Sequence, residues 1–256
     1  YYFHPDERQN IAYPILESKS PLLYDQKNFD IGTFPLIIIK ATYPLFGGLF
    51  FGLSDPLAQV VVTSRFFTAL LSVLSALLVY KIATDYFKKM TGVISLFLML
   101  FFVGNIQYSH FGTVEMWEAF FLTILLYYSL RIARKTTLGD SVITGLITAL
   151  ALGVKVLTLV AIPAITLSFL TGALSNKSRK VIFRHVGMLS LFFLAVIITS
   201  FTLMPHVFLN FENAYPSLKF ESDVTLGKLP VFYTQGFNGT IPYLFQLTNI
   251  YPFLIN

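Results

Sequence analysis

Long apolar runs dominate this 256-residue chain and leave few folds open to it. A helix needs about 20 apolar residues to cross the hydrocarbon core of a bilayer. Runs that reach or approach this length occupy residues 56–87, 90–106, 114–132 and 181–204. Only 12% of the residues are charged, against about 25% in a typical soluble domain. So little charge cannot cover a water-facing surface, and the sequence predicts an all-α, polytopic transmembrane helix bundle.

The apolar stretch at residues 141–170 needs a different interpretation. It is too long for one upright span and short for two. Lys155 lies near its centre, where a cation in a single span would lie close to the costly midplane of the bilayer. Two short helices that meet at a turn near Lys155 would avoid this cost, and we expect that arrangement.

The basic residues fall in clusters between the apolar runs. They are Lys81, Lys88 and Lys89; Arg131, Arg134 and Lys135; and Lys177, Arg179, Lys180 and Arg184. If residues 141–170 form two helices, all three clusters lie on one side, which the positive-inside rule assigns to the cytoplasm. A single helix there would place the last cluster on the opposite side. The net charge of +5 therefore reflects membrane topology and does not indicate a nucleic-acid partner.

We therefore divide the chain, as one transmembrane domain, into an outer loop at 1–55, membrane spans at 56–204, a second outer loop at 205–240 and the start of a further span at 241–256. Within the first loop, residues 6–16 predict a short helix and residues 34–51 an amphipathic or re-entrant helix on the outer surface. The chain starts at Tyr1 within a polar motif and shows no signal peptide, and it stops just inside an apolar run. We expect it to be a fragment that lacks an N-terminal span and a C-terminal portion.

Two acidic motifs lie on the side opposite the basic clusters. Asp6 and Glu7, in FHPDER, could act as a general base or bind a cation. Glu115 lies at the start of the 114–132 run, and Glu118 follows one turn deeper on nearly the same face. Acids in the first turn of a helix also favour its dipole, so a purely structural role stays open for each motif.

The cations and histidines on that side are further candidates. Lys155 and Arg65 could hold a phosphate group, or could extend toward lipid headgroups. His4, Arg8 and His110 are candidates for substrate binding. The spacing of His4, His110 and His206 matches no helical metal-binding pair, so we expect no histidine-based metal site. The chain contains no cysteine, Walker loop, GxGxxG motif or nucleophile elbow, which excludes thiolate chemistry and leaves soluble nucleotide chemistry unsupported.

Several of these motifs, in this order, resemble one family of membrane enzymes. FHPDE at 3–7, followed by KNFDIGTFPL at 27–36, is similar to the first outer loop of the GT-C superfamily. The closest group is the dolichyl-phosphate-mannose–protein mannosyltransferase-like family, glycosyltransferase family 39. The segment QYSHFGTVEMWEAFF at 107–121 is similar to the second acidic motif of this family. The segment LGVKVLTLVAIP at 152–163 is similar to its lysine-containing hairpin. LPVFYTQGFNGTIPYLFQLTN at 229–249 is similar to its outer segment before a later span.

The resemblance implies a glycosyltransferase of the mannosyltransferase type in the cell membrane, with its active site on the non-cytoplasmic side. It implies a polyprenyl-phosphate sugar donor and a hydroxyl acceptor on a protein, lipid or glycan. Asp6 would be the catalytic base with Glu7 beside it, and Lys155 or Arg65 would stabilise the donor phosphate. Glu115 takes the second acidic position, where family members more often have Asp. The resemblance leaves open whether a divalent cation is bound, and no other cofactor is expected.

A secondary transporter or a lipid-linked sugar translocase is the alternative, because the lysine hairpin would suit either. Transporter sites are expected near the bilayer midplane at broken helices. Here the acids gather at the outer ends of the spans and in the outer loops, which favours catalysis at the membrane surface. A purely structural subunit would leave these acids unexplained.

Overall fold

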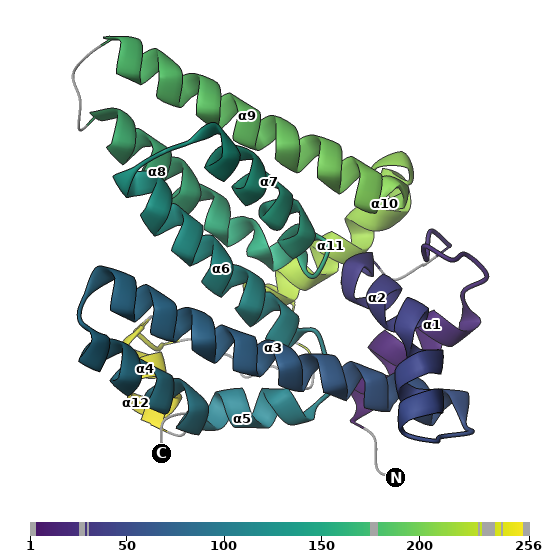
Figure 1. The fold of residues 1–256 in the computed structure, drawn as a ribbon. Coiled ribbons are helices and arrows are strands. Elements are labelled where there is room, and N and C mark those ends of the chain that lie inside the picture. Colours follow the sequence, from purple (N-terminus) through teal and green to yellow (C-terminus); the bar gives the residue numbers. More distant parts are fainter. Residues whose placement is uncertain are drawn as a thin grey trace.

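The computed structural model describes residues 4–25, 29, 31–174, 179–229, 231, 239–241 and 243–252, and these fold into helices joined by turns and loops (Figure 1). The only β-pairing among them is an isolated antiparallel bridge between Ile31 and Lys155. The helices are η1 Glu7–Ala12, α1 Tyr13–Glu17, α2 Thr33–Tyr43, η2 Pro44–Phe50, α3 Pro56–Tyr86, α4 Lys89–Phe101, α5 Val103–His110, α6 Glu115–Arg134, α7 Leu138–Leu152, η3 Val156–Val160, α8 Ala161–Leu174, α9 Arg179–Leu203, α10 Pro205–Leu209, α11 Phe211–Thr225 and α12 Leu244–Asn249.

The expected all-α polytopic bundle is confirmed. Five helical stretches in the described part of the chain are long and apolar enough to cross a membrane, and a sixth forms if α4 and α5 are counted as one span. The runs at 56–87, 114–132 and 181–204 correspond to α3, α6 and α9. Helix α3 begins sharply because Pro56 occupies its first turn and the Asp55 carboxylate accepts hydrogen bonds from the N–H groups of Leu57 and Ala58.

The run at 90–106 is not the single straight helix that its hydropathy predicts. The helix breaks at Phe102, and α4 and α5 meet at an angle of 52°. The Asn105 side chain stabilises the break, because its Nδ2 donates to the Met99 carbonyl at 3.2 Å. The same Nδ2 donates to Ser72 Oγ on α3 at 2.9 Å, which ties the bend to its neighbour. A polar residue that satisfies a freed carbonyl makes such a break tolerable inside an apolar helix.

The predicted helical pair within 141–170 is confirmed. Helix α7 ends at Leu152, Lys155 lies in extended conformation in the turn, and η3 and α8 return the chain. Residues 6–16 are also helical, as η1 followed by α1, with Asp6 and Glu7 at the start.

The helix predicted at 34–51 is present as α2 and η2. Thr33–Phe50 together are as long and apolar as a membrane span. Its position on the outer surface stays a prediction.

Apolar residues cover much of the outside of the bundle, and small polar residues line part of its inside. Helix α3 exposes Val73 and Leu77 but buries Ser64 and Thr68. Helices α7 and α9 pack so closely that a Cβ at Gly145 would come within 2.7 Å of the Phe192 carbonyl oxygen. Such a distribution, with apolar groups outward and small residues between helices, is typical of a bundle that has lipid as its solvent.

Basic side chains gather at one end of the bundle. Arg131 Nε lies 2.8 Å from the buried Asp140 carboxylate, and the Arg134 guanidinium lies 3.7 Å from the centre of the Tyr86 ring. Arg184 donates to the Thr136 carbonyl at 3.3 Å. We call this the basic end. Of the predicted basic clusters, Lys177 lies outside the described residues.

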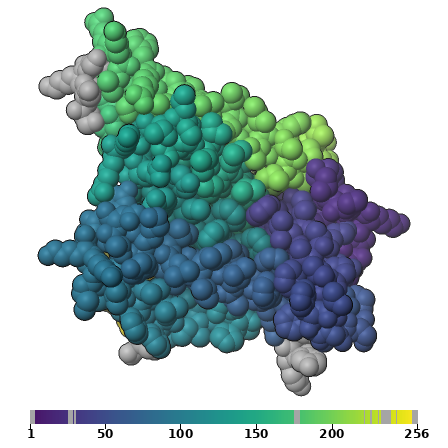
Figure 2. All heavy atoms as spheres, viewed as in Figure 1, coloured from purple at the N-terminus to yellow at the C-terminus, as the bar shows by residue number. Residues whose placement is uncertain are grey.

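The N-terminal segment packs at the opposite end of the bundle. Figure 2 shows this segment, in purple, against the yellow-green region around the end of α9 and α10. Tyr24 Oη donates to the Thr202 carbonyl at 3.4 Å, and the rings of Tyr24 and Phe29 lie 5.6 and 6.0 Å from the His206 ring. We call this the site end, because it carries Glu7, Glu115 and Lys155.

Candidate active site

Glu7 is a buried anchor that joins three separate segments. Its side chain is 0% exposed, and within the described residues it accepts four hydrogen bonds. Arg65 of α3 donates through Nε and Nη2, both at 2.7 Å. The backbone N–H groups of Gly112 and His4 donate at 2.6 and 2.8 Å. With both oxygens engaged twice, Glu7 has no lone pair left for an acceptor proton.

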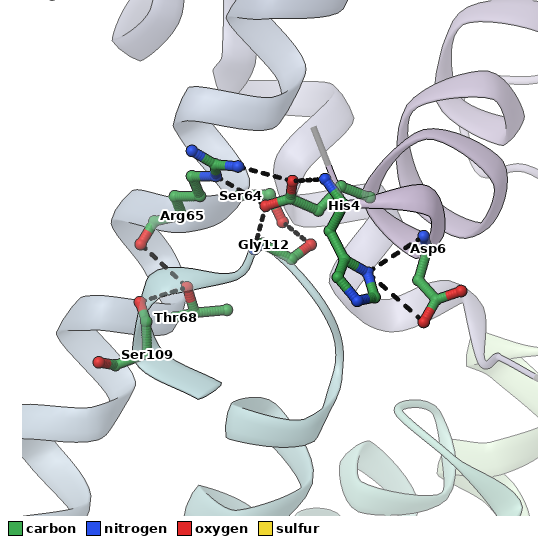
Figure 3. Close-up of polar contacts among 8 residues, drawn as sticks. His4, Asp6, Ser64, Arg65, Thr68, Ser109 and Gly112 are labelled. Atoms are coloured by element: carbon green, nitrogen blue, oxygen red, sulfur yellow. Dashed lines mark hydrogen bonds and ion pairs between the residues drawn. The ribbon is translucent and has the colours of Figure 1, made fainter. Parts of the chain in front are cut away.

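The loop after α5 is shaped to reach Glu7. Ser64 Oγ donates to the Gly112 carbonyl at 2.7 Å, while the Gly112 N–H points to Glu7 (Figure 3). A Cβ at Gly112 would lie 2.8 Å from the Ser64 Cβ, so only glycine allows this approach. Thr68 Oγ1 donates to the carbonyls of Arg65 and Ser109, which holds α5 against α3.

The electrostatics of Glu7 favour its ionised form. Burial raises the pKa of Glu7, but the hydrogen bonds from Arg65 and from the backbone of Gly112 and His4 together outweigh burial. The pKa of Glu7 therefore lies below its usual value. Glu7 is thus a carboxylate that stays charged and paired.

Asp6 has the opposite environment. Its side chain is 55% exposed and turns away from Arg65 (Figure 3). His4 Nδ1 lies 3.6 Å from Asp6 Oδ2, and Asn10 Nδ2 approaches Asp6 Oδ1 at 3.5 Å. Both contacts are long, so Asp6 keeps accessible oxygens. Of the two adjacent acids, Asp6 is free to accept a proton and Glu7 is not.

Arg65 is engaged as a structural partner. Its Nε and Nη2 both bind Glu7, in the two-pronged geometry that guanidinium and carboxylate groups prefer. If Arg65 binds a donor phosphate, as predicted, it would do so through the remaining guanidinium nitrogen. This assignment stays a prediction.

Lys155 and the second acidic motif meet at the site end. Lys155 Nζ lies 3.9 Å from Glu115 Oε1 and 3.9 Å from Glu118 Oε2. Glu115 and Glu118 thus share one face of α6, as their spacing predicts. Both distances exceed ordinary hydrogen-bond length, so the ammonium group is attracted to the two carboxylates without being fixed by either.

The Lys155 turn is held by the segment that precedes α2. The N–H groups of Gly32 and Phe34 donate to the carbonyls of Val154 and Gly153, both at 2.9 Å. A Cβ on Gly32 would overlap the Gly153 carbonyl. The FDIGTF and LGVK motifs, more than 100 residues apart in the chain, therefore form one unit, although Asp30 itself lies outside the described residues.

Two predicted substrate-binding residues contact groups close to them in the chain. Arg8 Nη2 donates to Tyr13 Oη at 2.8 Å, and His110 Nδ1 lies 2.6 Å from the carbonyl of Ile106 in its own helix. His4 is the third, and it lies beside Asp6 with its ring 4.8 Å from that of Phe111. Of these three residues, His4 is the one whose side chain lies next to that of Asp6, the predicted base.

Sequence reasoning did not identify every residue that builds the site. The Gly112 N–H and the Ser64 hydroxyl had no recognisable signal, because their contacts lie 105 and 48 residues away in the chain, respectively. Glu118 had a signal, its helical spacing from Glu115. Within the described residues, no group of three or more His, Asp or Glu side chains could hold a metal ion.

Comparison with known protein families gives a match to this chain. A family model described as dolichyl-phosphate-mannose-protein mannosyltransferase matches residues 43–204. This range includes Arg65, Glu115 and Lys155 and begins after Asp6 and Glu7. No curated protein and no solved structure gives a significant match.

Proposed function

Because the chain belongs to the dolichyl-phosphate-mannose-protein mannosyltransferase family, we propose that it transfers a sugar from a polyprenyl-phosphate donor to a hydroxyl acceptor. Family and apolar helices together make it an integral membrane glycosyltransferase of the mannosyltransferase type. The donor phosphate, the hydroxyl acceptor and a non-cytoplasmic active site belong to the proposal.

The assignment of the base rests on one observation: the adjacent acids Asp6 and Glu7 have unequal environments. Glu7 is buried and fully hydrogen-bonded, whereas Asp6 is 55% exposed and only loosely contacted. A general base must have a free lone pair within reach of the acceptor proton. Asp6 has the accessible oxygens that this role requires, and in the proposal Glu7 positions Asp6 by fixing the first turn of η1 to α3.

The reaction follows from these roles. The acceptor oxygen forms a bond to the anomeric carbon of the donor sugar while the bond from that carbon to the phosphate oxygen breaks. Asp6 takes the acceptor proton, and the phosphate leaves with the electron pair. Lys155 offers three N–H donors to the charge that develops on the phosphate, and the nearby apolar surroundings strengthen this contact.

Charge balance near Lys155 bears on the divalent cation that the sequence left open. Glu115 and Glu118 bring two carboxyl groups to the single ammonium group of Lys155. Mg²⁺ is commonly bound by one or two carboxylates together with substrate phosphate oxygens. Glu115 and Glu118 would be the protein ligands if such an ion accompanies the donor.

The first test is transfer by the full-length protein in liposomes supplied with a radiolabelled polyprenyl-phosphate sugar and an acceptor extract. We expect the wild type to release label from the lipid and Asp6→Asn to lose at least about a hundredfold in rate, as expected when a general base is removed. Glu17→Gln, an exposed acid on the neighbouring helix α1, is the matched control and should retain wild-type rates.

Undiminished turnover in Asp6→Asn would remove Asp6 as the base. Absence of release from the wild type across several sugars would instead argue against the transfer reaction itself and favour the transporter alternative.

A further inference from the structure

A cavity of about 380 Å³ lies at the site end, separate from the Glu7 anchor. Its walls come from the segment before α2, the turn into η3, the end of α9, and helices α10 and α11. Most of the lining side chains are apolar, among them Leu152, Val156, Ile197, Phe208 and Leu218. Its size falls within the range of small-molecule sites, roughly 300–1,000 Å³.

Three polar atoms in this apolar lining have no hydrogen-bond partner among the described residues: Thr33 Oγ1, Ser200 Oγ and His206 Nδ1. Thr33 is 1% exposed and Ser200 is 4% exposed, so bulk water does not satisfy them. A buried polar group that lacks a hydrogen bond destabilises the folded protein. Three such groups around one cavity indicate a ligand that supplies the missing partners.

Ser200 differs from two other hydroxyl residues of α9 in the hydrogen bonding of its side chain. Thr202 Oγ1 donates to the Ile198 carbonyl at 2.8 Å, and Ser190 Oγ donates to the Val186 carbonyl at 3.0 Å. Hydroxyl side chains in a helix usually satisfy themselves in this manner. Ser200 makes no such bond and lies at the cavity wall, so its hydroxyl is left for another partner.

The lining also determines the charge of the ligand. Among the described residues that line the cavity, none is Lys, Arg, Asp or Glu. Burial lowers the pKa of His206, which keeps the imidazole neutral near pH 7. An anionic phosphate would therefore enter without a counter-charge, at a large desolvation cost. A hydroxyl group, which both donates and accepts, matches two hydroxyls and a neutral imidazole.

We propose that this cavity binds an uncharged lipid alcohol, with its hydroxyl group bonded to Thr33, Ser200 and His206 and its chain against the apolar wall. Ile31, which forms the bridge with Lys155, and Val156, which follows Lys155 in the chain, both line the cavity, so the bound alcohol lies beside the Lys155 turn. The site is distinct from that of the donor phosphate, and the proposal does not depend on the transfer reaction.

The test uses the full-length protein in lipid nanodiscs and a diazirine-bearing hexadecanol. We expect photolabelling of peptides from the end of α9, α10 and α11. Combining Thr33→Val with Ser200→Ala should weaken apparent affinity about tenfold or more, because two hydrogen bonds are lost. Thr202→Val, two residues from Ser200 on α9 and absent from the cavity lining, is the matched control and should label as the wild type does.

Competition identifies what the cavity recognises. Unlabelled hexadecanol should displace the probe, whereas hexadecane and hexadecyl phosphate should not. If the double variant fails to fold, Thr33→Ser and Ser200→Thr, which keep the hydroxyls, should fold and retain labelling, and loss of labelling in these folded variants would overturn the proposal. Displacement by hexadecyl phosphate as strong as by hexadecanol would overturn it in favour of a donor-chain site. Labelling only at other positions would also overturn it, leaving a cavity filled by water.

Discussion

Neighbouring acidic residues in this chain take different tasks because their side chains leave the backbone in different directions. Glu7 turns toward α3 and becomes the partner of Arg65, while Asp6 stays at the surface of the same first turn. The guanidinium and two backbone N–H groups keep Glu7 charged without a proton-transfer role. In the proposed reaction, the position of Asp6 therefore depends on Glu7, whose own two oxygens are engaged by Arg65 and by backbone N–H groups.

We predict that Glu7→Gln lowers the free energy of unfolding by roughly 1–3 kcal/mol, because the amide cannot accept all four hydrogen bonds. Folding lowers the pKa of Glu7, so its stabilising effect is complete above its unfolded pKa, about 4.3, and is lost as the pH falls through the lower folded value. Thermal unfolding in detergent at neutral and acidic pH measures both effects.

The matched variant is Arg65→Gln, alone and combined with Glu7→Gln. A buried pair should show coupling, so the double variant should lose less stability than the two single variants summed. Additive losses would contradict the anchor role.

The two interpretations of Lys155, phosphate binding and contact with lipid headgroups, predict different binding results. We predict that Lys155→Ala weakens binding of a polyprenyl phosphate about tenfold or more, since a contact to a charged group contributes roughly 1.5–3 kcal/mol. Equilibrium binding to protein in nanodiscs measures this. Lys135→Ala, an exposed lysine next to the basic end, is the control. Unchanged affinity in Lys155→Ala would return Lys155 to a headgroup contact.

At the scale of elements, the segment before α2 and the turn after α7 act as one unit. Their two hydrogen bonds and the Ile31–Lys155 bridge place Lys155 in extended conformation, facing Glu115 and Glu118. The cavity wall continues from the same bridge. A shift of either segment would disturb both the position of Lys155 and the wall of the cavity.

We predict that Gly32→Ala separates this pair, because the new Cβ would overlap the Gly153 carbonyl. Transfer should fall at least about tenfold while insertion into the membrane persists, since displacements of about 1 Å near a reacting centre can cost as much as a hundredfold. Activity in liposomes, with a protease-protection assay for insertion, measures this. Gly187→Ala in α9 has no atom within 4 Å of its new Cβ and should retain activity. Full activity in Gly32→Ala would show that the bridge does not position Lys155.

The elements also show how far the sequence could predict the fold and the site. Helices α3, α6 and α9 follow from hydropathy, because a long apolar run in lipid can only be helical. The helical pair around Lys155 follows from the cost of a buried cation. The break at Phe102 does not, since it depends on Asn105 reaching Ser72 on another helix. The Glu7–Arg65 pair spans 58 residues, and no local pattern specifies such a contact.

At the scale of the whole molecule, charge divides the bundle into two unlike ends. The basic end carries Arg131, Arg134 and Arg184, fixed by contacts between helices. The site end carries Asp6, Glu7, Glu115, Lys155 and the cavity. Because cytoplasmic loops are enriched in Lys and Arg, this division predicts that the two ends face different compartments.

Cysteine labelling can test that topology directly, because this chain contains no cysteine of its own. We predict that Lys135→Cys, next to the basic end, is protected from a membrane-impermeant maleimide in intact cells, while Glu17→Cys, in the exposed part of α1, reacts. Permeabilised cells, in which both should react, control for accessibility. Reaction of both cysteines in intact cells would place the two ends on one side, and reaction of Lys135→Cys alone would invert the protein. Inversion would put Asp6 in the cytoplasm, and the donor would then have to be presented from that leaflet.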